Sequence, residues 1–351
     1  MISFSPGPSK VYDQLAVYLK DAFDQGILSA NHRSSVFMHL YQETEELLKE
    51  KLDIPEDYKL LFTSSATENW EIITQSVVES SSFHLYSGSF GKKWFDFARY
   101  LDSSVSGIQI DKEKEVDVKS LAIDEKFDLI ALTQNETSNA TQVSQEILAA
   151  LGEKYPEKML AIDTTSSMAG VYLDFSVADI WFASVQKCFG LPAGLGLLIL
   201  SPKAIEKVRR KGEKGRYNSL SFMLENAENF QTHYTPNVLG IYLLKRSLED
   251  IPFISTTANT LEYRMGRLEE IIHQSESLDF LIQNPTTRSR TVLGISGEET
   301  FIQQIKKAAE SAGMQMGSGY GSLKPTSFRI ANFPAVTDEE FEGLVNFLKG
   351  Y

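Results

Sequence analysis

The stretches MLAIDTTSS (residues 159–167) and IWFASVQKCFG (residues 180–190) each begin with a short apolar run and continue into polar residues. Continuous apolar runs of this length are typical of strands that are buried on both faces of a parallel sheet. Asp163 follows the first run directly, and Lys187 follows the second just before a Gly/Pro loop. Because ligands of open parallel sheets bind outside the carboxyl ends of the strands, both side chains are expected in one crevice.

The same alternation of apolar runs and helical patterns extends on both sides of this stretch. It predicts a βαβα order, and therefore a mostly parallel, seven-stranded-type sheet sandwiched by helices. Two further helices are expected before it, at residues 11–23 and 36–52, the second capped by Ser34 or Ser35. The predicted strands cover residues 59–63, 83–86, 127–132, 159–162, 180–183 and 196–200, and the helices between them cover 66–78, 90–101 and about 142–151.

The last third of the chain has a different pattern. A long helical region is predicted over residues 238–270, followed by strands at 290–295 and 327–331 and helices at 298–312 and 338–348. This pattern predicts a smaller C-terminal α+β domain. We expect a large domain over residues 15–245 and the small one over 246–351, with residues 1–14 packing against the small domain or near the active site.

Composition excludes several classes of protein. The 351 residues carry a net charge of −13, which argues against a partner that is a nucleic acid or an anionic membrane surface. The single cysteine, Cys188, cannot form a disulfide framework, and the five histidines are scattered, so no metal site is expected. The N-terminus lacks a signal-peptide pattern, and no run of about 18 apolar residues exists to span a bilayer. A cytoplasmic protein is expected.

An acid and a lysine at the edge of a parallel sheet suit pyridoxal phosphate. This cofactor needs a lysine that forms a Schiff base and a carboxylate that keeps its ring nitrogen protonated. Spacing alone also allows a simpler interpretation, in which Asp163 caps a turn and Lys187 is a surface residue.

Six ordered blocks decide between these interpretations: FSPGP (4–8), LFTSSATE (61–68), GSFGKKW (88–94), TQNET (133–137), YTP (234–236) and SFRI (327–330). With the Asp163 and Lys187 stretches, they resemble the class V aminotransferases of PLP fold type I, and most closely the phosphoserine aminotransferase branch. The resemblance implies pyridoxal phosphate as cofactor and Lys187 as its Schiff-base lysine and later proton carrier. It also implies that Asp163 pairs with the ring nitrogen and that Gln186 lies near the ring hydroxyl or the phosphate.

The resemblance implies further cofactor contacts. The start of a predicted helix, with its free N–H groups, suits a phosphate, although Ser65 and Glu68 also form a capping-box pattern there. Thr235 would reach the cofactor phosphate of a neighbouring subunit, which implies a homodimer with shared active sites. The implied cofactor contacts are Ser65, Ala66 and Thr67 at the phosphate, Phe90 on the ring face, Thr137 at the ring hydroxyl, and Thr235 from the neighbour.

Substrate binding is implied at Arg329 for the α-carboxylate, because a guanidinium matches a carboxylate bidentately, and at His32 and Arg33 for a substrate phosphate. A second His-Arg pair, expected just upstream of Arg329, is missing, and Lys324 is a candidate replacement. The implied reaction is transamination between phosphoserine and 2-oxoglutarate by a ping-pong cycle, as in serine biosynthesis. The alternatives are serine or alanine transamination with glyoxylate or pyruvate and, more remotely, an inactive binding protein of the same fold.

Overall fold

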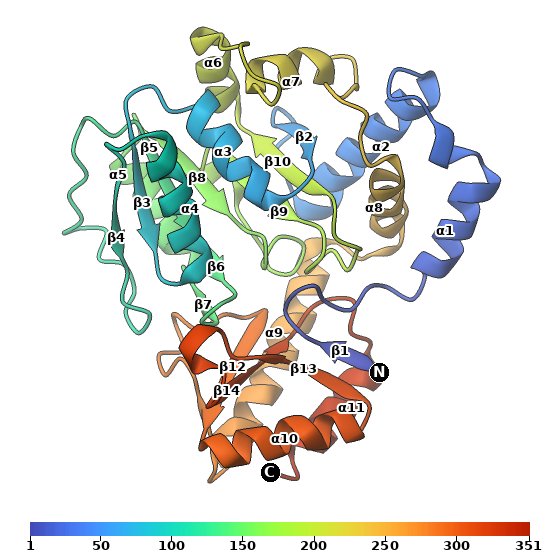
Figure 1. The fold of residues 1–351 in the computed structure, drawn as a ribbon, viewed down its shortest axis with the longest axis vertical. Coiled ribbons are helices and arrows are strands. Elements are labelled where there is room, and N and C mark those ends of the chain that lie inside the picture. The colour runs from blue at the N-terminus through green and yellow to red at the C-terminus, as the bar shows by residue number, and fades with distance from the viewer.

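The computed structural model describes residues 1–351 throughout, and its larger part is built on a seven-stranded sheet (Figure 1). The strand order is β2-β10-β9-β8-β5-β3-β4, and only β10 runs antiparallel to its neighbours. The prediction of a mostly parallel sheet is therefore confirmed. The strands are β2 (Lys59–Thr63), β3 (Ser82–Tyr86), β4 (Ser106–Gln109), β5 (Leu129–Thr133), β8 (Met159–Asp163), β9 (Ile180–Ser184) and β10 (Gly196–Leu200).

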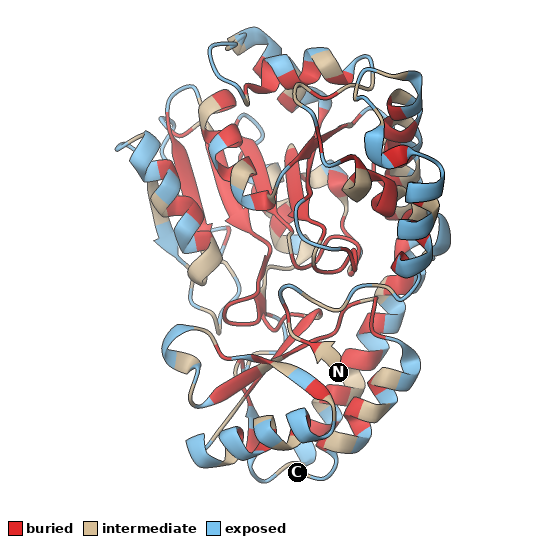
Figure 2. Ribbon diagram, turned by 45° about the vertical axis from the view of Figure 1, so that its right-hand side comes forward, coloured by how far each residue is buried: buried red, intermediate tan, exposed pale blue.

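The central strands are buried along their whole length, as their apolar sequences require (Figure 2). Helices cover both faces of the sheet, and serine side chains cap the first turns of several of them, including Ser34 before α2 and Ser144 before α5. The helices of this part are α1 (Leu15–Asp24), η1 (Ile27–Ser29), α2 (Ser35–Leu52), α3 (Ala66–Ser76), α4 (Ser89–Leu101), α5 (Gln145–Lys154), η2 (Phe175–Val177), α6 (Pro202–Lys211), α7 (Leu220–Ala227) and α8 (Val238–Asp250).

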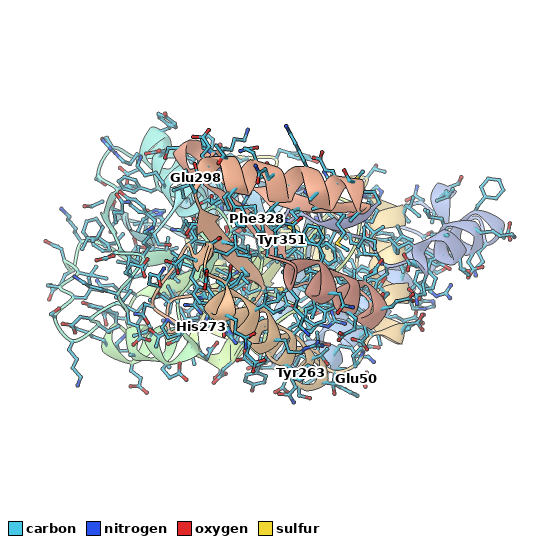
Figure 3. The ribbon with its side chains drawn as sticks, turned by 90° about the horizontal axis from the view of Figure 1, so that it is seen from below. Glu50, Tyr263, His273, Glu298, Phe328 and Tyr351 are labelled. Carbon is cyan, nitrogen blue, oxygen red and sulfur yellow. The ribbon has the colours of Figure 1, made fainter.

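A second, five-stranded sheet occupies the lower half of Figure 1, in the order β1-β13-β14-β12-β11. Its first strand comes from the other end of the chain, because Ile2 pairs in parallel with Met314. Figure 3 shows this part from below, with α9, α10 and α11 packed over the sheet and with Tyr263 and His273 on α9. The elements are β1 (Ile2–Phe4), α9 (Ile254–Gln274), β11 (Leu278–Phe280), β12 (Val292–Gly297), α10 (Glu299–Ser311), β13 (Met314–Ser318), η3 (Gly321–Leu323), β14 (Ser327–Ala331) and α11 (Asp338–Leu348).

Two separate hydrophobic clusters accompany the two sheets. The larger one also includes Val292, Ala331 and Phe333 from the C-terminal part, so apolar packing crosses between the sheets. The predicted domain limits of 15–245 and 246–351 stay a prediction.

Several predicted elements need correction. The expected helical region 238–270 is two helices, because the chain turns at Ile251-Pro252-Phe253, where proline has no N–H to continue a helix. The helix expected from residue 11 begins at Leu15. The short strands β1, β4, β11 and β13 and the charged helix α6 were not predicted. The segment 211–216, interpreted as a loop, begins inside α6 at Lys211.

No helix is long and apolar enough to cross a bilayer.

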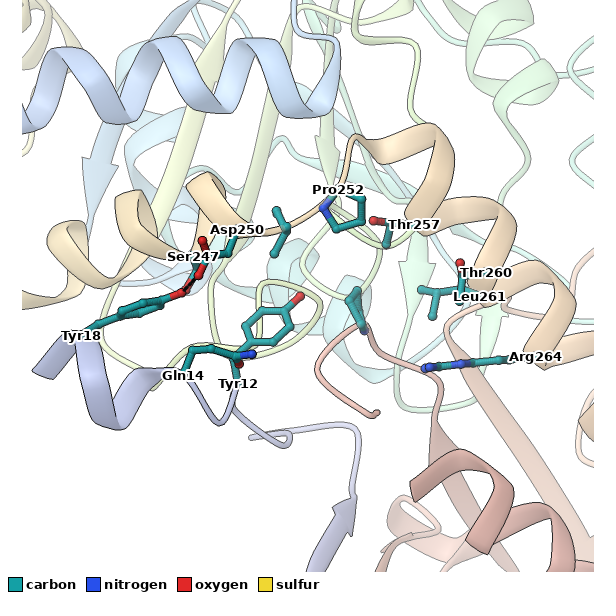
Figure 4. Close-up of a pocket in the computed structure, with 12 residues that line it drawn as sticks. Tyr12, Gln14, Tyr18, Ser247, Asp250, Pro252, Thr257, Thr260, Leu261 and Arg264 are labelled. Atoms are coloured by element: carbon teal, nitrogen blue, oxygen red, sulfur yellow. Dashed lines mark hydrogen bonds between the residues drawn. The ribbon is translucent and has the colours of Figure 1, made fainter. Parts of the chain in front are cut away.

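A cavity of about 200 Å³ lies between α1 and the corner that joins α8 to α9 (Figure 4). Tyr12, Tyr18, Pro252 and Arg264 are among the residues that line it, and none of the predicted site residues does so. The predicted site residues therefore lie elsewhere in the fold.

Candidate active site

A cavity of about 230 Å³ lies at the carboxyl ends of β5, β8 and β9. This is the location expected for a ligand of an open α/β sheet. Gly7 and Pro8 from the N-terminal segment form part of its wall. Seven of the predicted cofactor residues line this cavity: Ala66, Thr67, Phe90, Thr137, Asp163, Gln186 and Lys187.

The Lys187 side chain is buried in this cavity, and its Nζ donates a hydrogen bond to Thr137 Oγ1 over 2.9 Å. Burial, together with the positive charge of Arg329, lowers the pKa of Lys187 from 10.5 to about 8. Gly7 leaves room for the amine, since a Cβ at this position would lie 3.2 Å from Nζ. Lys187 is therefore a confined amine with a large neutral fraction at mildly alkaline pH.

Asp163 lies at the end of β8, where Thr165 and Trp70 hold its carboxylate. The Thr165 N–H and hydroxyl donate to Oδ1 over 3.0 and 2.5 Å, and the Trp70 indole N–H donates to Oδ2 over 3.2 Å. Burial raises the pKa of Asp163, while these hydrogen bonds oppose the rise. A buried carboxylate without a cation in contact suits a cationic ring nitrogen. The nearby Thr133 Oγ1 is buried, lines the cavity and has no hydrogen-bond partner.

The first turn of α3 closes the cavity at another point. Ser65 is the N-cap and accepts from the Glu68 N–H over 3.2 Å, while the Ala66 N–H donates to Ser184 Oγ over 2.7 Å. Glu68 reaches back to the Ser64 N–H, so the second bond of the expected capping box is displaced by one residue. Ser65 does not line the cavity, but Thr67 does. The positive end of α3 suits a phosphate.

Phe90 is fixed by Glu136, a residue that the sequence analysis did not single out. The buried Glu136 carboxylate accepts from the N–H groups of Phe90 and Gly91, each over 3.0 Å, and from the Ser138 N–H and hydroxyl. Gly88 leaves the necessary space, since a Cβ there would lie 2.5 Å from Glu136 Cγ. The available sequence signal was that Glu136 follows the buried strand β5 by three residues, at the carboxyl end of the sheet.

Arg329 lies beside the cavity but does not line it. Its Nη1 donates to the Thr137 carbonyl oxygen over 2.6 Å, and its Nε donates to the Ser318 carbonyl oxygen over 2.9 Å. Burial lowers the pKa of this guanidinium. Because Thr137 contacts both Lys187 and Arg329, it links the amine to the predicted carboxylate-binding group.

Three predicted residues lie away from this cavity in the single chain. Arg33 and Thr235 are exposed, and the ring nitrogen Nε2 of His32 lies 3.4 Å from Arg33 Nε. The candidate replacement Lys324 does not line the cavity either, and its role stays a prediction. Lys324 is exposed beside Lys306 of α10, whose pKa it lowers together with burial.

The family described as aminotransferase class-V matches residues 4–333 of the sequence. The chain belongs to the class V aminotransferases. Among solved structures of this fold, a phosphoserine aminotransferase from Cytophaga hutchinsonii is 34% identical, with a TM-score of 0.95 over 99% of this chain and 98% of the other. The phosphoserine aminotransferases of Rhodococcus opacus and Corynebacterium glutamicum are 25% and 26% identical, over 97% and 98% of this chain and 92% and 93% of theirs.

This class V aminotransferase is a pyridoxal-phosphate-dependent transaminase, as the blocks of sequence indicated. The residues present fit the cofactor. Lys187 offers the amine, Asp163 the carboxylate for the ring nitrogen, and Phe90 an aromatic face, while the start of α3 offers N–H groups to the phosphate. The orphaned Thr133 hydroxyl marks a polar position that a ligand of the cavity would satisfy.

Proposed function

We propose that this class V aminotransferase transfers the amino group of L-phosphoserine to 2-oxoglutarate, as a step of serine biosynthesis. The observation that carries the proposal is the meeting of Lys187 and Asp163 in one buried cavity, in a chain whose near-full-length relatives are phosphoserine aminotransferases. In the ping-pong cycle, the enzyme keeps the donor's amino group between the two half-reactions.

Lys187 and Asp163 in the cavity and Arg329 beside it each have a role in this scheme. When bound, the cofactor supplies a protonated, conjugated ring that accepts the electron pair left when the substrate's Cα loses its proton. Lys187 takes that proton, which its pKa of about 8 favours. Asp163 stabilises the positive charge on the ring nitrogen, and Arg329 binds the α-carboxylate of the amino acid and of the keto acid.

The groups that position Phe90, Lys187 and Arg329 belong to two adjacent residues, Glu136 and Thr137. The Glu136 carboxylate accepts from the Phe90 N–H and so holds the backbone that carries the ring. Thr137 orients the Lys187 amine with its hydroxyl and holds Arg329 with its carbonyl oxygen. Preorganisation of this kind reduces the reorganisation needed in the transition state.

A single half-reaction tests the substrate. The purified protein is loaded with pyridoxal phosphate and mixed with L-phosphoserine without any keto acid, and the visible absorbance of the bound cofactor is followed. Faster conversion by phosphoserine than by serine or alanine is expected. Conversion by serine or alanine alone would favour the serine or alanine transaminases, and the absence of any bound-cofactor band would contradict the role of Lys187.

We also propose that the enzyme acts in the cytoplasm as a homodimer in which Thr235, His32 and Arg33 reach the neighbour's active site. Arg33 and Thr235 are exposed in the single chain, and exposed apolar side chains such as Phe23 and Val36 lie in the adjoining helices α1 and α2. The buried, unpaired thiol of Cys188 is compatible with a reducing compartment.

A hybrid experiment tests the shared site. A Lys187→Ala subunit and an Arg33→Ala subunit should each be poor at phosphoserine transamination alone. In a hybrid dimer, the intact Lys187 of one subunit would meet the intact Arg33 of the other, so mixing and re-equilibrating the two should restore activity. Dimers that regain no activity on mixing would place Arg33 outside its neighbour's site.

A further inference from the structure

We propose that Lys93 and Tyr320 contribute to the subsite for the second anionic group of the substrate, together with His32 and Arg33 of the neighbouring subunit. This group is a phosphate if the proposed function holds. Lys93 lies on α4, and Tyr320 lies in the loop between β13 and η3. Lys93 Nζ is 3.3 Å from the Tyr320 hydroxyl, so the contact joins the large sheet's helices to the small sheet. This inference rests on the proposed function, and it assigns residues that would make the enzyme prefer phosphoserine to serine.

Both residues adjoin groups already placed at the active site. Lys93 Nζ lies 5.5 Å from the centre of the Phe90 ring, and Lys187 Nζ lies 5.6 Å from the same point. The Tyr320 ring lies 5.7 Å from the Phe90 ring, and the Arg329 guanidinium is also 5.7 Å from the Tyr320 ring centre. Tyr320 and Lys93 therefore lie beside Phe90 and Arg329, next to the cavity although not in its lining.

The charge of Lys93 is available to a ligand. Its neighbour Lys92 is paired with Asp96 one helical turn away, but Lys93 has no carboxylate partner within 4.0 Å, and its hydrogen-bond partner is a neutral phenol. The Lys93 side chain is exposed, so its ammonium group can turn toward an incoming anion without leaving a buried site. An ammonium with three donors can bind a phosphate while it keeps the Tyr320 contact.

The substrate needs such a cation. A chain with a net charge of −13 repels a dianionic phosphate unless local positive groups oppose the field. Arg329 is used by the α-carboxylate, His32 and Arg33 are proposed to approach from the neighbouring subunit, and Lys324 lies beside Lys306 of α10. Lys93 would add a cation from the same chain as Lys187. Tyr320 belongs to the stretch in which the second His-Arg pair is missing. Its ring lies near the Arg329 guanidinium, and its hydroxyl contacts Lys93 Nζ.

Steady-state kinetics of the holoenzyme test this subsite, with L-phosphoserine and L-serine as alternative donors. Lys93→Met should raise the ratio of the phosphoserine KM to the serine KM by about tenfold, which corresponds to the loss of one charge-assisted hydrogen bond. Lys93→Arg should restore most of the ratio, and Tyr320→Phe should raise it by less. Lys92→Met is the matched control, because it removes a lysine one position away that is already paired.

Competition by inorganic phosphate against serine gives a second readout, and its inhibition constant should rise in Lys93→Met. An unchanged KM ratio in Lys93→Met, or an equal change in Lys92→Met, would overturn the subsite while phosphoserine remained the substrate. If the wild-type holoenzyme converts serine or alanine but not phosphoserine, the proposed function fails and the subsite fails with it. Unchanged cofactor absorbance and melting temperature in the variants establish that they are folded.

Discussion

Replacing Lys187 with methionine is expected to stabilise the cofactor-free protein near neutral pH while abolishing transamination. The buried amine has a pKa of about 8, against 10.5 for an exposed lysine. At about 1.4 kcal/mol per pKa unit, keeping this side chain protonated in the fold costs about 3 kcal/mol. Methionine has a similar shape and no charge, so it removes this cost but also loses the hydrogen bond to Thr137, which is worth about 1 kcal/mol. A net gain of about 2 kcal/mol remains.

The pH dependence is the sharper part of this prediction. Between pH 8 and 10.5 the unfolded chain binds more protons at Lys187 than the folded chain, so the wild-type protein gains stability as the pH rises through this window. Below pH 8 the full cost of the charged lysine is present. The advantage of Lys187→Met should therefore be largest near pH 7 and should turn into a deficit of about 1 kcal/mol at pH 10.5, where the lost hydrogen bond to Thr137 remains.

Urea unfolding of the cofactor-free proteins, followed by tryptophan fluorescence, measures the free energy of unfolding near pH 7 and at pH 10.5. Lys92→Met serves as the control because Lys92 is exposed, and it should change the free energy of unfolding by less than about 0.5 kcal/mol at either pH. No gain near pH 7, or a gain of the same size at both pH values, would refute the reasoning that a charged Lys187 is held at a cost.

Four other substitutions give distinct outcomes. Asp163→Asn should bind the cofactor but lower kcat by roughly 100-fold or more, equivalent to about 2.7 kcal/mol of transition-state stabilisation, as measured in single-turnover absorbance traces. Arg329→Met should raise the KM of both the amino acid and the keto acid, because one guanidinium serves both half-reactions, and an effect on only one of them would contradict this role. Gly88→Ala should displace Glu136 and Phe90 and lower activity and melting temperature, whereas Gly266→Ala, in an open position on α9, should stabilise the protein by about 0.5–1 kcal/mol.

Sequence patterns predicted those parts of the fold and site that depend on neighbours in the chain. The buried strands β5, β8 and β9 are short apolar runs, and such runs have few alternatives to a sheet interior. Asp163 and Lys187 could be placed in one crevice because each follows a strand of the same sheet. The family resemblance then added the neighbours that line the same cavity.

Contacts between distant segments could not be predicted in this way. Glu136 acts on the start of α4, about 46 residues earlier in the chain, and nothing in its own segment indicates which N–H groups it will accept from. The helix α6 was missed because its sequence is dominated by lysine and arginine. One of these residues, Lys207, is buried by pairing with Asp128 over 2.6 Å, a partner that only the fold supplies.

The N-terminal segment connects the small sheet to the loop that carries Lys187. It begins as β1 in the small sheet and then passes the cavity, where the Ser9 N–H and hydroxyl donate to the carbonyl oxygens of Gln186 and Lys187 over 3.1 and 3.2 Å. The Tyr12 N–H donates to the Gly190 carbonyl oxygen over 3.0 Å, and a Cβ on Gly190 would clash with the Tyr12 ring. The loop that carries the amine is therefore held by a segment anchored in the sheet that carries Arg329. Any displacement of the small sheet will act on Lys187 and on the carboxylate-binding arginine at the same time.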